Sequence, residues 1–355
     1  MSSTVEDVMR AVKLVNWKSD PEIVDVEKPT PAAGQVVIKI GGAGVCHSDL
    51  HLMHDFDQRS LPWGPPFTLG HENAGWVDSI GTGVTSVHEG QAVAVYGPWG
   101  CGSCERCRLG LETYCDNLTK APIRGGGGGL GLDGGMAEFM LIPHERFLVP
   151  LPEGIDPLHA APLTDAGLTP YHAVRRSQAK LTPNAWAVVI GVGGLGHLGI
   201  QILKATCASR IIAVDPRSAA RELALLEGAE FAVAPEEAHL FIMDQTNGRG
   251  AEVILDFVGS TSTMDLGVSA TRILGDYTLI GIAGGDFRFS FFSQKYEVSL
   301  QTTYWGSRNE LVEVLELGAR GLLSAKIEPH TLDQALNVYQ DLAEGYIDGR
   351  AVIVP

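Results

Sequence analysis

Four cysteines crowd into one short stretch of the chain, at Cys101, Cys104, Cys107 and Cys115, in the pattern C-x2-C-x2-C-x7-C. Four thiolates form a complete tetrahedral ligand set for zinc and leave no position for water or substrate. The spacing therefore predicts a closed zinc site that stiffens the fold. An iron–sulfur cluster is the alternative, but nothing else in the sequence indicates electron transfer.

A second set of residues could form an open metal site. Cys46 offers a thiolate in the segment Cys46–His51, and His71 offers an imidazole in Gly70–Glu72. A catalytic zinc has three protein ligands and keeps one position exchangeable. Because the remaining cysteine, Cys207, falls in a predicted helix, we expect the third ligand to be a carboxylate.

A dinucleotide motif follows the apolar run Ala187–Ile190. It reads G-x-G-x-x-G and comprises Gly191, Gly193, Gly194, Leu195 and Gly196. Glycines there permit a tight strand-to-helix turn, and the helix N-terminus supplies donors to a pyrophosphate. Asp215 ends the next apolar run at the spacing of a ribose-binding acid, which favours NAD. The nearby Arg217 keeps NADP as an alternative.

The elements that carry these residues differ between the two parts of the chain. Up to about residue 165, short runs such as Val36–Ile40 and Ala92–Val95 predict a mostly β region. From about 186, continuous apolar strands alternate with helices, which predicts a parallel sheet covered on both faces. The expected strands are Ala187–Ile190, Ile211–Val214, Val253–Phe257 and Tyr277–Ile280. The expected helices are Leu195–Ala208, Ser218–Glu227, Asn309–Ala319 and Leu332–Ala343, before a last strand Ala351–Val354.

Length and charge limit the possible architectures and partners. A chain of 355 residues is expected to form two domains. The formal charge of −16 disfavours nucleic acid and anionic membranes as partners. No uninterrupted apolar window approaches the ~18 residues of a membrane span, and the cysteines suit a reducing cytoplasm. The glycine-rich stretch 125–135 is expected to be an irregular loop at the surface or at a pocket edge.

Taken together, the motifs resemble those of the zinc-containing medium-chain alcohol dehydrogenases, and the resemblance to bacterial secondary-alcohol dehydrogenases is strongest. The residues that carry it are Gly44–Asp49, Gly70–Glu72, the four-cysteine loop, Gly191–Gly196 with Asp215, Pro162–Tyr171, Tyr304–Gly306 and Gly349–Arg350. The resemblance implies an α/β protein with a mostly β, GroES-like catalytic domain over residues 1–165 and 306–355. A Rossmann domain with a doubly wound parallel sheet is expected over residues 166–305.

The resemblance also implies roles at the open metal site. Asp165 is the expected third ligand, where many relatives have a cysteine, and Glu72 is the rival ligand beside the metal. Zinc would act as a Lewis acid on the alcohol while NAD takes the hydride. Ser48 would accept the alcohol proton, and His51 would relay it to solvent.

Contacts to cofactor and substrate follow from the same resemblance. His47 and Arg350 would contact the cofactor pyrophosphate, and Val258, Ile282 and Trp305 would hold the nicotinamide. The implied substrate pocket consists of Trp63, Leu130, Phe292 and Trp305, a bulky apolar set suited to hydrophobic or aryl alcohols.

The expected activity is reversible hydride transfer between a primary or secondary alcohol and NAD, giving an aldehyde or ketone, with two zinc ions per chain. A polyol or sugar dehydrogenase of the same superfamily is one alternative. A non-catalytic redox sensor that binds zinc and a dinucleotide is another. The resemblance further implies a homo-oligomer, with a tetramer favoured over a dimer.

Overall fold

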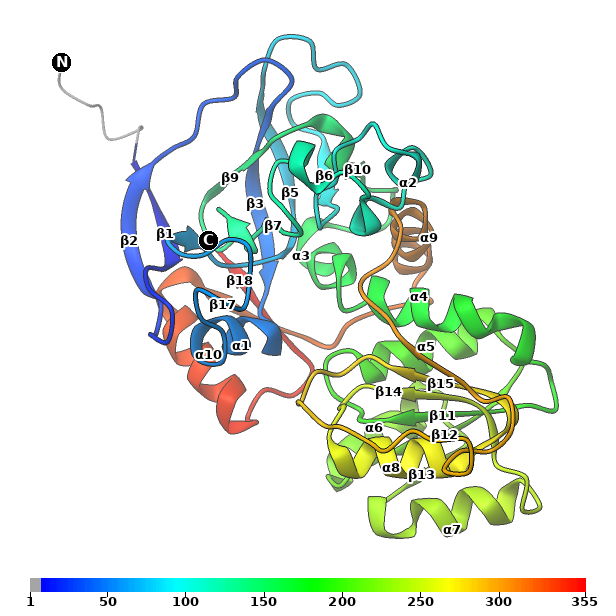
Figure 1. Cartoon of the computed structure of the whole chain (residues 1–355). Helices are drawn as coiled ribbons and strands as arrows, with labels where there is room; N and C mark the ends of the chain where they lie inside the picture. Colours follow the sequence, from blue (N-terminus) through cyan, green and yellow to red (C-terminus); the bar gives the residue numbers. More distant parts are fainter. Residues whose placement is uncertain (1–7) are drawn as a thin grey trace, which may run out of the picture. The chain divides into compact units, whose positions relative to one another are not determined.

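The structure is a computed structural model that describes residues 8–355. Its contacts divide the chain into two compact units. The first contains the described residues up to Asp165 together with Ser307–Pro355, and the second contains Ala166–Gly306 (Figure 1). The chain returns from the second unit to the first after Gly306, one residue beyond the junction at 305/306 expected from the sequence. Among residues 8–355, no helix has the length and apolar character needed to cross a bilayer.

The first unit is built on β-sheets, as predicted. Its seven-stranded sheet has a buried central strand, β3 (Val36–Gly44), which is antiparallel to both β5 (Glu72–Ile80) and β18 (Arg350–Val354). The rest of the sheet comprises β10 (Leu148–Pro150), β6 (Ala92–Val95), β17 (Ile327–Thr331) and β9 (Phe139–Ile142). A three-stranded sheet has the order β2 (Glu22–Glu27), β1 (Val8–Leu14), β4 (Phe67–Thr68). Their apolar side chains share one core.

Short helices complete the first unit. They are α1 (His47–His54), α2 (Glu105–Arg108), α3 (Pro157–Ala160), α9 (Arg308–Ala319), α10 (Ala335–Glu344), and the 3-10 turns η2 (Glu112–Tyr114), η3 (Leu118–Lys120), η4 (Glu145–Phe147), η5 (Ala161–Thr164) and η7 (Leu332–Gln334). The helix expected over Leu332–Ala343 is therefore a 3-10 turn followed by α10. Helix α10 packs against α1 and ends at Gly345, whose φ of 78° is left-handed.

The second unit is a six-stranded sheet in which every neighbouring pair is parallel. Its order is β13 (Phe231–Val233), β12 (Arg210–Val214), β11 (Trp186–Ile190), β14 (Ala251–Asp256), β15 (Thr271–Leu279), β16 (Ser299–Thr302). The helices are α4 (Leu168–Ser177), α5 (Gly196–Thr206), α6 (Ser218–Glu227), α7 (Pro235–Gln245) and α8 (Thr261–Ala270), with a 3-10 turn η6 (Gln178–Lys180). This strand order is that of a Rossmann sheet. The chain adds strands outward from β11 on one side and from β14 on the other, and dinucleotides bind at this change in strand order in such folds.

The glycine-rich stretch, expected to be an irregular loop at the surface or at a pocket edge, is partly buried and contains two short paired strands. Residues 126–129 are buried, and β7 (Gly127–Gly128) pairs with β8 (Gly131–Leu132). The segment packs closely against the turn before His71. A Cβ added to Gly129 would come only 2.5 Å from the Gly70 carbonyl and 2.8 Å from the His71 nitrogen. Glycine thus permits a backbone approach that places His71.

Replacing Gly129 with alanine tests this close approach. Gly129→Ala must displace the backbone of Gly70 and His71, because a Cβ there would clash with it. Gly125 has a similar left-handed φ, 66° against 75° at Gly129, but a Cβ there meets nothing within 4 Å. We expect Gly125→Ala to cost roughly 1–2 kcal/mol of strain, and Gly129→Ala to cost that plus roughly 1–3 kcal/mol of overpacking. Urea unfolding measures both free energies. Equal losses would show that the approach to His71 is unimportant.

Candidate functional site

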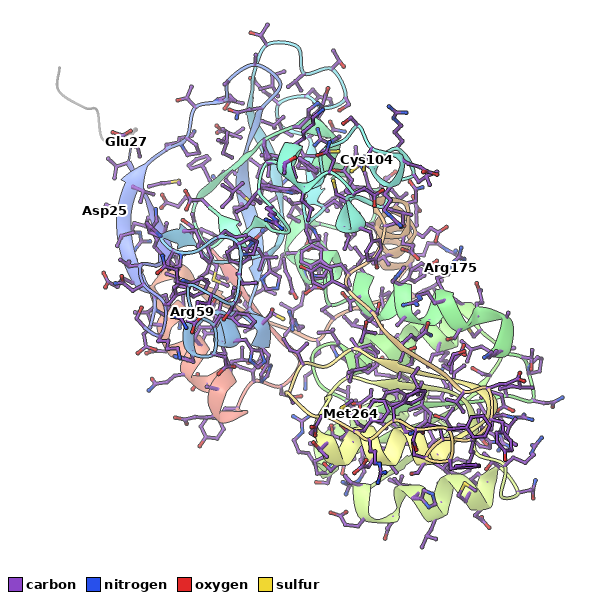
Figure 2. The ribbon with its side chains drawn as sticks, viewed as in Figure 1. Asp25, Glu27, Arg59, Cys104, Arg175 and Met264 are labelled. Carbon is purple, nitrogen blue, oxygen red and sulfur yellow. The ribbon has the colours of Figure 1, made fainter. Side chains whose placement is uncertain are left out.

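The four cysteines predicted to bind metal meet in one cluster. The Sγ atoms of Cys101, Cys104, Cys107 and Cys115 all lie within 4.8 Å of one another, and all four thiols are free. Figure 2 labels Cys104 on this loop. Backbone amides point at the sulfurs, as in the 3.3 Å contact from Cys101 N to Cys115 Sγ. A hydrogen bond from the Ser103 side chain lowers the pKa of Cys101 to about 5. The cluster has the donors of a closed zinc site.

The second predicted set also comes together, within the first unit. One ligand atom from each of Cys46, His71, Glu72 and Asp165 lies within 4.8 Å of the others, and all four residues are buried. Cys46 is the N-cap of α1, while His71 and Glu72 lie at the start of β5. Asp165 follows η5 directly. Each ligand therefore sits at the end of a regular element.

Contacts on both edges of the ring fix the orientation of His71. Its Nε2 lies 3.2 Å from Ser48 Oγ and 3.5 Å from Asp165 Oδ2. On the other edge, Nδ1 lies 3.1 Å from Oδ1 of Asp49. The Nε2 atom thus faces the other candidate ligands, and Nδ1 faces a carboxylate, which is the usual arrangement around a metal-binding histidine.

Sequence reasoning gave Asp49 no role, although it lies in the Cys46–His51 segment. Its side chain is fully buried, and its Oδ2 accepts a hydrogen bond of 3.2 Å from the Cys46 backbone N–H. One carboxylate therefore contacts two candidate ligand residues. Its position three residues after Cys46, on the first turn of α1, is a signal that could have identified it.

Glu72 forms a buried ion pair with Arg350. An Nη2 hydrogen of Arg350 is donated to Oε1 of Glu72, and both side chains are at most 4% exposed. The other carboxylate oxygen, Oε2, is buried and has no hydrogen-bond partner among residues 8–355. Burial raises the pKa of Glu72 to about 7, against the lowering effect of Arg350. The predicted pyrophosphate contact of Arg350 stays a prediction.

The donor set fits a divalent cation. Three acidic side chains, those of Cys46, Glu72 and Asp165, are packed around one imidazole, and Arg350 balances one of them. Buried charges are stable only when they are paired or bind metal. A thiolate, an imidazole and a carboxylate are ligands that suit zinc. The Oε2 atom of Glu72, which has no hydrogen-bond partner among residues 8–355, is a further possible metal ligand beside them.

The proposed proton-relay residues lie on α1. Ser48 is half-buried against His71, whereas His51 is partly exposed, with its Nδ1 paired to the Asp55 carboxylate. His47 is exposed at the start of the same helix. Ser48 and His51 are three residues apart, so they share one face of α1. Their roles stay predictions.

Two of the predicted substrate-pocket residues lie together in the first unit. Trp63 stacks on Trp17 with ring centroids 6.4 Å apart, and a Cβ on Gly131, next to Leu130, would come 2.6 Å from the Trp63 ring. In the second unit, Phe292 is 88% exposed and Trp305 is buried. Their part in a substrate pocket stays a prediction.

The glycine motif has the geometry that a dinucleotide requires. Gly191 ends β11 with a φ of 86°, and a Cβ on Gly196 would come 1.8 Å from the Gly191 carbonyl oxygen, so α5 packs directly on the strand. A Cβ on Gly193 would meet nothing within 4 Å. Gly194 and Leu195 complete the turn before α5. The turn thus leaves open space where a pyrophosphate would approach the helix N-terminus.

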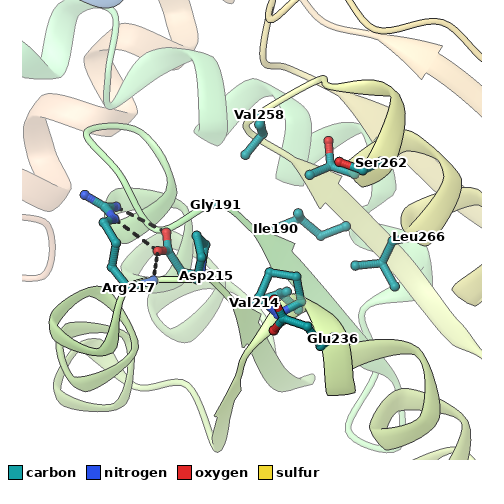
Figure 3. A pocket seen from close by; sticks show the side chains of 12 residues that line it. Ile190, Gly191, Val214, Asp215, Arg217, Glu236, Val258, Ser262 and Leu266 are labelled. Carbon is teal, nitrogen blue, oxygen red and sulfur yellow. Dashed lines mark hydrogen bonds and ion pairs between the residues drawn. The ribbon is translucent and has the colours of Figure 1, made fainter. Parts of the chain in front are cut away.

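Beside this turn is a pocket of about 540 Å³ lined by Asp215 and Val258 (Figure 3). Asp215 accepts hydrogen bonds from the backbone of Val192 at 2.9 Å and from the Arg217 guanidinium at 3.1 and 3.2 Å. Burial alone would raise the pKa of Asp215, but these hydrogen bonds hold it below its usual value. Asp215 is therefore an ionised acceptor. Ile282 follows β15 and is 56% exposed.

Comparison with known proteins accounts for both units. Residues 32–153 match the alcohol dehydrogenase GroES-like domain, and residues 194–320 match the zinc-binding dehydrogenase domain. An NAD-dependent alcohol dehydrogenase of Sulfurisphaera tokodaii is 34% identical over 98% of this chain and 100% of its own length. A D-arabinose 1-dehydrogenase (NADP(+)) of Saccharolobus solfataricus is also 34% identical, over 98% of this chain and 97% of its own.

A solved structure agrees with these matches. The crystal structure of the alcohol dehydrogenase of Aeropyrum pernix has a TM-score of 0.89 and 34% sequence identity, and the match covers 98% of this chain and all of that one. The matches extend over nearly the whole chain and include both the GroES-like and the Rossmann parts. This protein belongs to the zinc-containing medium-chain alcohol dehydrogenase family.

Proposed function

We propose that this protein is a zinc-dependent alcohol dehydrogenase that interconverts a primary or secondary alcohol with the corresponding aldehyde or ketone, with NAD as hydride carrier. The main support for this proposal is that Cys46, His71 and Asp165 are buried and that their ligand atoms lie within 4.8 Å of one another. In this reading the first unit is the catalytic domain and the second binds NAD. The cysteine cluster at residues 101–115 would hold a second, structural zinc.

When bound, zinc supplies a Lewis acid for the alcohol oxygen, and NAD supplies the hydride acceptor. The chain's own residues prepare the site for this chemistry. Cys46, His71 and Asp165 would hold the metal, and Asp49 fixes the ring of His71 from behind. Ser48 presents its hydroxyl 3.2 Å from His71 Nε2, where it would take the alcohol proton. His51, paired with Asp55 at the edge of α1, would pass the proton to solvent.

Asp165 is the better candidate for third ligand. The Arg350 guanidinium occupies one oxygen of Glu72 and offsets its charge, which weakens Glu72 as an anionic ligand. Asp165 Oδ2 lies 3.5 Å from His71 Nε2, on the side of the ring that faces the other candidate ligands. Glu72 keeps Oε2 as a donor, so it remains the rival ligand.

Paired variants separate the two carboxylates. We expect Asp165→Asn to abolish turnover and to lower the zinc content from two ions per chain to one, because the four-thiolate site is untouched. Glu72→Gln should retain both ions, since Arg350 already holds that side chain. Elemental analysis with an alcohol oxidation assay measures both effects. Full activity of Asp165→Asn together with zinc loss in Glu72→Gln would transfer the ligand role to Glu72.

We propose NAD rather than NADP as the cofactor because the Asp215 carboxylate would accept from the ribose hydroxyls and repel a 2′-phosphate. The half-exposed Arg217 is held against that carboxylate, so its charge is offset. A Saccharolobus relative is named for NADP(+), so NADP is the alternative cofactor to test.

Removing the carboxylate should change the cofactor preference. We expect Asp215→Ala to lower kcat/KM with NAD by about 10- to 100-fold, because hydrogen bonds to a charged group contribute about 1.5–3 kcal/mol. The freed Arg217 should then raise activity with NADP, and adding Arg217→Ala should abolish that gain. Steady-state assays with both cofactors measure these changes. An unchanged NAD preference in Asp215→Ala would refute the assignment.

We propose hydrophobic or aryl alcohols as the substrate class. Trp63 and Leu130 pack against the apolar core of the first unit, so this wall offers few hydrogen bonds to a polyol. The D-arabinose dehydrogenase relative supports the alternative of a sugar substrate. A second alternative is that the protein is not an enzyme but a redox sensor that binds zinc and a dinucleotide.

A substrate panel distinguishes these three readings. We expect kcat/KM for a secondary aryl alcohol to exceed that for a polyol of similar size by at least about tenfold, because hydroxyls left unpaired against an apolar wall lose binding energy. Reduced cofactor is followed by absorbance. Preference for D-arabinose would favour the sugar dehydrogenase. No turnover of any alcohol by a chain that contains two zinc ions would favour the sensor.

We further propose a homo-oligomer, a tetramer rather than a dimer, that works in the cytoplasm. Edge strand β16 pairs only with β15 among the described strands, and nearby apolar side chains of the second unit are exposed. These side chains are Ile273, Leu274, Phe289, Phe291, Phe292 and Tyr296. Exposed apolar patches and open sheet edges favour association. All six cysteines are free thiols, which suits a reducing compartment.

A further inference from the structure

The buried face of α10 carries a tyrosine that reaches the metal-site region. Tyr339 is 4% exposed, and its hydroxyl donates a 3.1 Å hydrogen bond to Oδ2 of Asp49 on α1. The two residues are 290 positions apart in the chain, so the contact exists only because α10 packs against α1. Met136 Sδ lies 2.8 Å from the same hydroxyl. The hydroxyl is therefore enclosed between two acceptors, of which the Asp49 carboxylate is the stronger because it is charged and a thioether is a weak acceptor.

Asp49 is the residue through which this hydroxyl could act. Its Oδ1 lies 3.1 Å from His71 Nδ1, and its Oδ2 receives the Cys46 backbone N–H at 3.2 Å as well as the Tyr339 hydroxyl. The side chain is 0% exposed, so water does not orient it. Removing a donor from a buried carboxylate leaves its charge poorly solvated and its orientation less defined.

Packing alone does not explain a tyrosine at this position. A phenylalanine would fill the same space, whereas a buried hydroxyl lowers stability unless it has a partner. Burial and the neighbouring Asp49 carboxylate raise the pKa of Tyr339, so the hydroxyl keeps its proton and remains a donor. The donated hydrogen bond is thus a lasting feature of the site.

We infer that Tyr339 is a positioning residue for the metal centre: its hydroxyl holds Asp49 so that one carboxylate oxygen faces His71 and the other the Cys46 backbone. The inference rests on the proposed function, in which His71 and Cys46 bind zinc. Groups that orient metal-binding residues from behind commonly change metal affinity by about 10- to 100-fold. Tyr339 acts one contact further out, so we expect an effect near the lower end.

The test is the zinc retention of Tyr339→Phe, measured on the full-length protein with a chelator. The four-thiolate zinc in the same chain is an internal reference that Tyr339 does not contact. We expect one of the two ions to bind about tenfold more weakly, while the other is retained as in the unmodified protein. Cobalt substitution should show an altered absorption spectrum from the weakened site. Tyr277→Phe is the matched control, because it removes another buried hydrogen bond from a tyrosine to a carboxylate, that of Asp256.

A double-mutant cycle shows whether the effect passes through Asp49. In an Asp49→Asn background, Tyr339→Phe should weaken zinc binding little further, because the orienting carboxylate is already gone. Equal zinc retention in Tyr339→Phe and the unmodified protein would overturn the inference, as would loss of both ions together through unfolding. A single zinc in the unmodified protein would instead contradict the proposed function.

Discussion

In the first unit, several acidic side chains are buried at one place, where their charge must be compensated. Cys46, Glu72 and Asp165 place a thiol and two carboxyl groups within 4.8 Å of one another around His71, and all of them are shielded from water. Arg350 forms an ion pair with Glu72 and also interacts with the Cys46 side chain, so one positive charge faces three acidic groups. Their mutual repulsion and desolvation would disfavour such an arrangement unless a divalent cation binds among them. Zinc therefore completes the fold of this region and also supplies its chemistry.

Two different arrangements hold the metal-binding residues. The four cysteines between residues 101 and 115 are close in sequence, so a single loop with amides directed at the sulfurs is sufficient. The buried site draws its residues from α1, β5 and η5, which are distant in sequence. The backbone approach at Gly129 positions the turn before His71, and the contacts of His71 with Asp49 and Asp165 connect this turn to α1 and to the end of η5. The first arrangement is closed by local geometry, while the second requires the whole unit to be folded.

This difference explains how much could be predicted from the sequence. Local signals predicted the four-cysteine loop, the glycine motif with Asp215, and helix α6 from Ser218 to Glu227, because spacing along the chain determines each of them. The contacts of Tyr339 with Asp49 and of Arg350 with Glu72 join residues 290 and 278 positions apart, and no local pattern encodes them. The glycine-rich stretch was expected to be an irregular loop at the surface or at a pocket edge for a related reason, because composition does not say which segments it packs against. Composition showed that glycines were needed but not that residues 126–129 are buried, with Gly129 against the backbone of Gly70 and His71.

The central claim is that a zinc ion is held by Cys46, His71 and Asp165. Anomalous X-ray diffraction from crystals of the purified protein, recorded above and below the zinc absorption edge, tests it most directly. We expect two zinc peaks per chain, one among the four cysteine sulfurs and one among Cys46 Sγ, His71 Nε2 and an Asp165 carboxylate oxygen. A peak at the cysteine loop alone, in protein that oxidises alcohols, would contradict the account.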